Sequence, residues 1–195
     1  MYERVDRVID YLNKRFIKLF NEARVIIKDF DELNIISYSK NLYNNIDIIT
    51  KEALLELAKA TVKDLGLDIE ITLVWLLERL NEYNPTTKFV YSNELERKRQ
   101  LFVEGMIASE NKNQELDICL RSVSKMVAQY VLEISDSALI YGYKEMGIQL
   151  VVWKTEEDKK VCEHCKKLNN KVFKIDNVPP KQHWNCRCYV LPKRI

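Results

Sequence analysis

The chain has 195 residues, of which 47% are hydrophobic and 31% are charged. This balance is typical of a folded, soluble domain and excludes a disordered tail, and no stretch of eighteen residues is apolar enough for a membrane span. Four Gly and four Pro are few for this length, which predicts long helices and argues against a sandwich or barrel with many turns. The N-terminus lacks the apolar core of a signal peptide, so we expect synthesis in the cytoplasm.

The net charge of +2 hides an uneven distribution. Residues 151–195 carry eleven basic and five acidic residues and have a net charge of +6, whereas the other 20 basic and 24 acidic residues give −4. Four of the five cysteines also lie in this basic C-terminal segment. The C-terminal quarter of the chain therefore differs chemically from the rest.

Apolar residues at steps of three and four predict an amphipathic helix over residues 1–30. A second helical pattern follows, in which we expect Thr50 to act as N-cap for the segment 51–65 and Gly66 to end it. Asp68 is then expected to cap a third helix over residues 69–83.

A break is predicted at Tyr83–Thr87, because Pro85 lacks an amide proton and biases the residue before it away from helix. After a short extended stretch, Ser92 is expected to cap the next helix. Helical spacing continues over residues 94–109 and again over 114–146, and Gly147 stands where a helix ends.

The period then changes to that of strands. Three β-rich runs, Ile148–Trp153, Val172–Ile175 and Tyr189–Leu191, are separated by loops rich in turn residues and cysteine. We therefore predict an α+β fold that is mostly α, with a helical body over residues 1–147 and a small antiparallel β module over 148–195. A module of this size buries little apolar surface, so a metal ion would supply the stability that its core lacks.

Cysteine and histidine spacing in the module indicates a structural Zn²⁺ site. Cys162 and Cys165 form one close pair, and His183, Cys186 and Cys188 form a second group that begins eighteen positions after Cys165. Two close groups of soft ligands joined by a loop suit a tetrahedral zinc ion. Five residues compete for four positions: Cys162, Cys165 and Cys186 are expected ligands, and the fourth is His183 or Cys188.

Other roles for these residues are less favoured. A disulfide is disfavoured in a reducing cytoplasm, and a thioredoxin-like redox pair would need a βαβ unit that the pattern does not offer. A catalytic zinc would need a placed general base, which neither Glu157, Asp158 nor Glu163 supplies from the sequence alone. We expect His164 to point to solvent and Cys119 to be a small core residue.

The same segment resembles a known family. Its pattern is similar to the C-terminal signature of phage minor head proteins related to the Mu F protein, the phage head morphogenesis family. The positions that carry the resemblance are Trp153, Thr155, Asp158, Val161-Cys162, Cys165, Leu168, Lys171-Val172-Phe173, Pro179-Pro180, His183, Cys186-Arg187-Cys188 and Pro192. The similarity extends more loosely through Tyr141–Gly147 and Tyr83–Arg99. Where the family commonly has Gly after the second Cys, this chain has Asn169-Asn170, which tolerates the same left-handed turn.

The resemblance implies a minor capsid protein of a phage or prophage, a non-enzymatic assembly component of the virion head that is made in the cytoplasm of the bacterial host. The implied partners are the portal protein and the major capsid or scaffold protein, with no membrane partner. The alternative is a zinc-containing nucleic-acid-binding protein that contacts packaged DNA weakly and without sequence preference. It is supported by the +6 segment, which three thiolates and one Zn²⁺ would lower to about +5. A zinc hydrolase or redox enzyme is the third and least favoured class.

Overall fold

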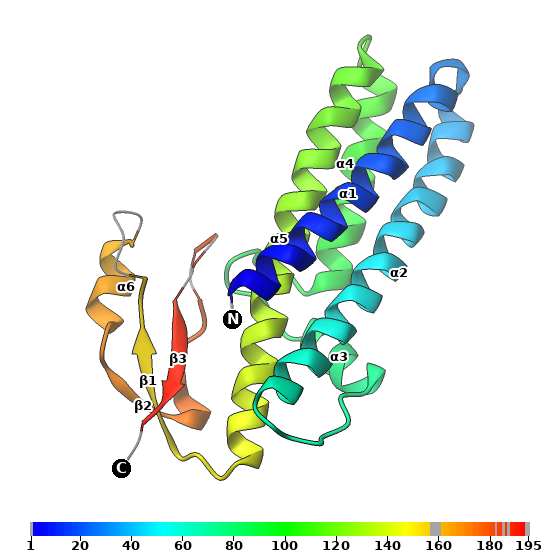
Figure 1. The fold of residues 1–195 in the computed structure, drawn as a ribbon. Coiled ribbons are helices and arrows are strands. Elements are labelled where there is room, and N and C mark those ends of the chain that lie inside the picture. The colour runs from blue at the N-terminus through cyan, green and yellow to red at the C-terminus, as the bar shows by residue number, and fades with distance from the viewer. Residues whose placement is uncertain (1, 157–160, 182, 185, 187, 194–195) are drawn as a thin grey trace.

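The computed structural model describes residues 2–156, 161–181, 183–184, 186 and 188–193. A bundle of long helices makes up one part of the molecule, and a small sheet with a short helix lies beside one end of it (Figure 1). The helices of the body are α1 (Tyr2–Ile26), α2 (Glu32–Asp64), α3 (Leu73–Leu80), α4 (Tyr91–Ala108) and α5 (Lys112–Glu145). The module contains β1 (Leu150–Lys154), α6 (Glu163–Leu168), β2 (Val172–Lys174) and β3 (Tyr189–Pro192).

The first helix ends slightly earlier than predicted, and the second is longer and less interrupted than the sequence predicts. A short 3₁₀ turn at Ile27–Asp29 ends α1, and the Asp31 side chain caps α2 by accepting a hydrogen bond from the backbone N–H of Asn34 at 2.8 Å. The prediction of an N-cap at Thr50 is wrong, because α2 runs through this position without a break and Thr50 is fully buried inside it. Gly66 follows α2 with a φ of +76°, which confirms the predicted stop.

The third helix is shorter than predicted. Residues 67–72 are not helical, and Thr72 rather than Asp68 caps α3, through a hydrogen bond from the backbone N–H of Trp75 to its hydroxyl at 3.2 Å. Asp68 does not cap a helix, because the residues after it form an irregular segment. From this segment the side chain of Ile71 enters the core, where it is 1% exposed. Packing of this side chain in the core outweighs a helix that could start earlier.

The break and the last two long helices agree closely with the sequence. The Tyr83–Thr87 segment is a turn, closed by a bridge between Asn84 and Phe89, and α4 starts at Tyr91 with Val90 at its N-cap. Ser92 lies inside the first turn of α4, so its predicted role as the cap is wrong. The α5 helix ends just before Gly147, which has the predicted left-handed conformation, with a φ of +72°.

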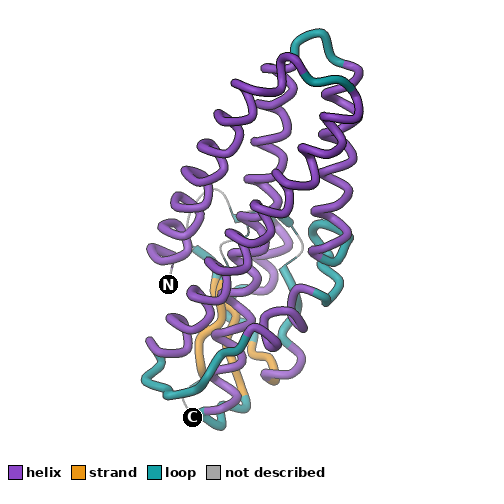
Figure 2. The backbone as a smooth tube through the Cα atoms, turned by 90° about the vertical axis from the view of Figure 1, so that its right-hand side faces the viewer, coloured by secondary structure: helices purple, strands orange, loops and turns teal. Residues whose placement is uncertain are grey.

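The long α5 helix organises the body. It packs against α1, α2 and α4, and the four helices run side by side along most of their length (Figure 2). Their inward faces form one continuous core, in which Phe16, Phe20 and Phe102 are completely buried. Among the described helices, none is both long enough and apolar enough to cross a bilayer.

The module is a three-stranded antiparallel sheet, as predicted, and its strands lie in the order β2-β1-β3. One face of the sheet carries Val151, Trp153 and Val190, which are at most 5% exposed. These residues pack in a second core with cysteines of the module and with Leu139 and Tyr143 of α5. The predicted fold class, mostly α with a small antiparallel sheet, is therefore confirmed.

Candidate metal centre

The first two candidate ligands lie at the start of α6, a helix of six residues that the sequence pattern does not reveal. Cys162 is the N-cap of this helix, and its sulfur accepts a hydrogen bond from the backbone N–H of Cys165 at 3.4 Å. The short turn brings both sulfur atoms to the same end of the helix. His164, between them, is exposed as predicted.

The second group lies in the loop that leads into β3. The Sγ atom of Cys165 lies 3.1 Å from Nε2 of His183 and 3.7 Å from Sγ of Cys186. The five predicted candidates form two overlapping groups that share Cys165: one with Cys162 and His183, the other with Cys186 and Cys188. In each group, the donor atoms lie within 4.8 Å of one another.

The distance between the two sulfur atoms fits a tetrahedral zinc ion. Two Zn–S bonds of about 2.3 Å at the tetrahedral angle place their sulfur atoms about 3.8 Å apart, close to the 3.7 Å between Cys165 and Cys186. A disulfide bond would need a sulfur separation of about 2.05 Å, so these two cysteines are not joined. The structure therefore brings together sulfur and imidazole donors that could hold a metal ion.

The orientation of His183 favours a role as a ligand. Its Nδ1 lies 3.1 Å from the backbone carbonyl oxygen of Trp184, to which the Nδ1–H donates. This bond leaves the lone pair of Nε2 directed at the sulfur of Cys165. A second hydrogen bond of this kind fixes the tautomer and ring orientation of metal-binding histidines in many proteins.

The cysteines differ in how readily they ionise. Burial raises the pKa of Cys165 to about 12, and contact with Cys188 together with burial raises the pKa of Cys186. The pKa of Cys162 is lowered, because the backbone N–H of Cys165 donates to its sulfur. Thiolates crowded in a buried cluster need a cation to stabilise them, which a bound Zn²⁺ would supply.

Contacts with the helical body hold the second ligand group in place. The ammonium of Lys125, on α5, lies 4.8 Å from the centre of the Trp184 ring, a distance typical of a cation–π contact. Lys181 forms a mostly buried ion pair with Asp136 of α5, with 2.6 Å between Nζ and Oδ2. Trp153 of β1 is 3% exposed and lies in the same core as Cys165 and Cys186.

The other predictions concern acidic residues near the ligands in the sequence and the lone Cys119 of the body. The carboxylate of Glu163 is exposed and pairs with Lys166 at 2.6 Å, so it points away from the cluster into solvent. Glu157 and Asp158 lie outside the described residues. Cys119 is buried on α5 as predicted, 5% exposed, with its pKa raised to about 12 mainly by burial.

Comparison with known proteins supports the resemblance seen in the sequence. Residues 110–191 match the model of a family described as phage Mu protein F like protein. Searches of curated proteins and of solved structures give no match. The matched segment begins near the start of α5 and contains both ligand groups and most of β3. The resemblance to the phage head morphogenesis family is thus confirmed over this segment, which supports a capsid-related protein.

Proposed function

Since residues 110–191 are those of a phage Mu F-like region, we propose that this protein is a minor component of a phage or prophage head that acts in head assembly. The family match is the single observation that carries this proposal. The matched residues include both the β module and α5, the helix around which the body is packed. The unit that the match defines is therefore one long helix with a cysteine-rich module fixed to its end.

The connection between body and module is suited to a protein that links other proteins. The body and the module share a core through Leu139 and Tyr143, and a second connection is made by the Lys181–Asp136 ion pair. Two contacts of different chemistry hold the module in one orientation. We infer that partners at the portal vertex or the capsid interior bind this rigid unit, with no turnover of substrate.

We propose further that a structural Zn²⁺ ion stabilises the module. Cys162, Cys165, Cys186 and His183 would hold it, with Cys188 as the alternative to His183. Bound to these four donors, the ion would neutralise the thiolates and tie α6 to the loop before β3.

Metal content and folding of the module test this assignment. Cys165→Ser should lower the zinc content of the purified protein to near zero and expose Trp153, whereas Cys119→Ser should change neither. The fourth ligand is found by comparing His183→Ala with Cys188→Ser, since only loss of a ligand weakens zinc retention against a chelator. An unchanged zinc content and an unchanged fold in Cys165→Ser would refute the metal site.

The assembly role is tested with head proteins of the same phage or prophage. The tagged protein is expressed with the portal protein or with the major capsid protein, and purified heads are analysed by mass spectrometry. The proposal predicts retention of one of these proteins and presence of this chain in the heads. If neither head protein is retained and the chain is missing from purified heads, the proposal is wrong.

A second candidate function is contact with packaged DNA. It is favoured by a group of exposed lysines in the described part of the module, namely Lys166, Lys167, Lys171, Lys174 and Lys193. Neutralisation of phosphates by lysine releases counterions, so such binding would weaken steeply with salt. A DNA affinity that falls at least tenfold between 50 and 200 mM salt, together with no retention of head proteins, would favour this function.

A further inference from the structure

The outward-facing side of the sheet, which we call the outer face, has an unusual composition. The register pairs Val152 of β1 with Val172 of β2 and with Leu191 of β3, so these three residues form one row across the sheet. The exposed fractions of Val172 and Leu191 are 43% and 41%. An antiparallel sheet that packs on one face usually carries polar residues on the other. Here an apolar row runs across all three strands instead.

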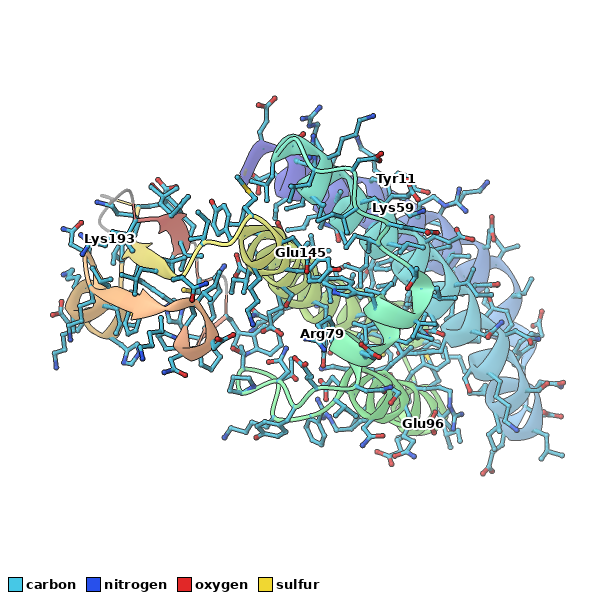
Figure 3. All side chains as sticks on the ribbon, turned by 90° about the horizontal axis from the view of Figure 1, so that it is seen from below. Tyr11, Lys59, Arg79, Glu96, Glu145 and Lys193 are labelled. Carbon is cyan, nitrogen blue, oxygen red and sulfur yellow. The ribbon has the colours of Figure 1, made fainter. Side chains whose placement is uncertain are left out.

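Lysines flank this row on both of its sides. On one side, Leu150 pairs with Lys174 of β2, and its carbonyl accepts a hydrogen bond from the backbone N–H of Lys193 at 2.9 Å. On the other side, Lys154 pairs with Tyr189. Lys174 and Lys193 are exposed, and Figure 3 shows Lys193 on the module at a distance from the helical body. None of the residues in these three rows is acidic.

We propose that the outer face binds a protein segment that presents apolar side chains between carboxylates, and that this segment belongs to the head protein with which the chain assembles. The inference rests on the proposed function. The apolar row would be covered by aliphatic side chains of the partner, while Lys174 and Lys193 would pair with acidic residues beside them. Complementary charges of this kind set the register and speed the encounter of partners.

Two other occupants fit the outer face less well. A nucleic acid would satisfy the lysines but would place phosphates over Val152, Val172 and Leu191, which gain nothing from them. A second copy of the chain that used the same face would bring lysines opposite lysines, a costly arrangement of like charges. An acidic, partly apolar protein segment satisfies both the row and its flanks.

The test uses two variants of the outer face and one control. Val172→Asp/Leu191→Asp places carboxylates in the apolar row, and Lys174→Glu/Lys193→Glu reverses the charge of the flank that contains Leu150. The control, Val25→Asp/Leu33→Asp, changes two exposed apolar residues, 74% and 77% exposed, at the α1–α2 turn at the far end of the body (Figure 1). Circular dichroism and zinc content verify that each variant folds like the unaltered protein.

Affinity for the retained portal or capsid protein is measured at 50 and 500 mM salt. The inference predicts a loss of at least tenfold for Val172→Asp/Leu191→Asp at both salt concentrations. For Lys174→Glu/Lys193→Glu it predicts a tenfold loss at 50 mM that shrinks at 500 mM, because salt screens exposed charges. The control should bind within twofold of the unaltered protein.

The outcomes separate this inference from the proposed function. If the unaltered protein retains no head protein, the proposed function fails and the inference fails with it. If it does retain one, and both outer-face variants bind as tightly as the control, only the inference is wrong. A 20-base-pair DNA duplex is the second probe. Loss of DNA binding in Lys174→Glu/Lys193→Glu, with unchanged affinity of both outer-face variants for the head protein, would assign the outer face to nucleic acid and overturn the proposal.

Discussion

The ion pair between Lys181 and Asp136 fixes the module to α5, and its removal should destabilise the whole protein. The Lys181 side chain is 5% exposed and that of Asp136 is 23% exposed, so water cannot replace a missing partner fully. Removing one member of a buried pair typically costs about 3–5 kcal/mol, because the other charge stays buried without compensation. We therefore expect Lys181→Met, which keeps most of the side-chain volume, to lower the free energy of unfolding by about 3–5 kcal/mol.

The surroundings of the pair make the loss of the lysine especially costly. Burial raises the pKa of Asp136, and Lys181 opposes this shift. Burial also raises the pKa of Glu133 one helical turn away, and Lys181 and Asp136 shift it in opposite directions. Without Lys181, both carboxyl groups would lose a cation that lowers their pKa values, and Asp136 would still raise that of Glu133. Since a domain of this size loses about 2–4 °C of melting temperature per kcal/mol, the melting temperature should fall by about 6–20 °C.

Urea denaturation, followed by circular dichroism and tryptophan fluorescence, measures this effect. A double-mutant cycle with Asp136→Leu supplies the control, because replacing both charges by apolar side chains is often nearly neutral. Lys181→Met/Asp136→Leu should thus recover most of the stability that either single variant loses. The reasoning is refuted if Lys181→Met costs less than about 1 kcal/mol, or if the double variant loses the sum of the two single losses.

Three further predictions concern the body and the turn beside the metal centre. Burial is the main cause that raises the pKa of Glu133 from its usual 4.5 to about 7. The stability this group contributes in its protonated form is present below about pH 4.5 and is lost as the pH rises through 7, by about 3 kcal/mol at most. The free energy of unfolding, measured by denaturation from pH 5 to 8, should fall as the pH rises. A Glu133→Gln variant with the same pH dependence would contradict the assignment to Glu133. Gly142→Ala should cost about 1–3 kcal/mol in a thermal melt, because the new Cβ would lie 2.4 Å from a methyl carbon of Leu65. Gly105→Ala, whose Cβ would meet only the longer and more flexible side chain of the half-buried Glu115, should cost less than Gly142→Ala in the same melt; equal effects of the two would refute the packing argument. Asn170 has a φ of 65°, so Asn170→Ala should cost about 1 kcal/mol of stability in the same melt, and Asn170→Gly should cost less. A larger loss of stability for Asn170→Gly than for Asn170→Ala would exclude a strained turn.

The sequence predicts the elements whose signal is local and long. The α5 helix follows from apolar spacing sustained over some thirty residues, and the strands follow from short β-branched runs between turns. The candidate ligands follow from spacing alone, since a C-x-x-C pair must place two sulfur atoms close together. The turn at Asn169-Asn170 is another local feature, and Asn170 has the left-handed conformation that the sequence suggests.

Helix starts could not be predicted, because many residues are chemically able to cap. Thr50, Asp68 and Ser92 all have side chains suited to an N-cap, yet the structure uses Asp31, Thr72 and the backbone at Val90. The choice depends on burial, which sequence alone does not show. Thr50 is 0% exposed in the core, and a cap there would interrupt a helix that packs along its whole length.

The contacts between body and module also could not be predicted from the sequence. Lys181 and Asp136 are 45 positions apart, and charged residues are rarely buried, so each looked like an ordinary surface residue. Near them, Asn84 and Gln129 both donate to the carboxylate of Glu133, with 2.8 Å from Nε2 of Gln129 to Oε1. Only the fold brings the turn before α4, the middle of α5 and the module together at this point.

The loop before β3 therefore has two roles that follow from the same short stretch of chain. His183 and Cys186 face the candidate metal centre, while Lys181 and Trp184 contact Asp136 and Lys125 on α5. A metal ion that fixes His183 would also restrain Lys181 and Trp184, which are only two positions and one position away along the chain. The metal centre would then stabilise the orientation of the module on the body as well as the module itself. If the outer face binds a partner in one register, as proposed, that binding would depend on this orientation, and a metal ion in the module would help to keep it fixed relative to α5.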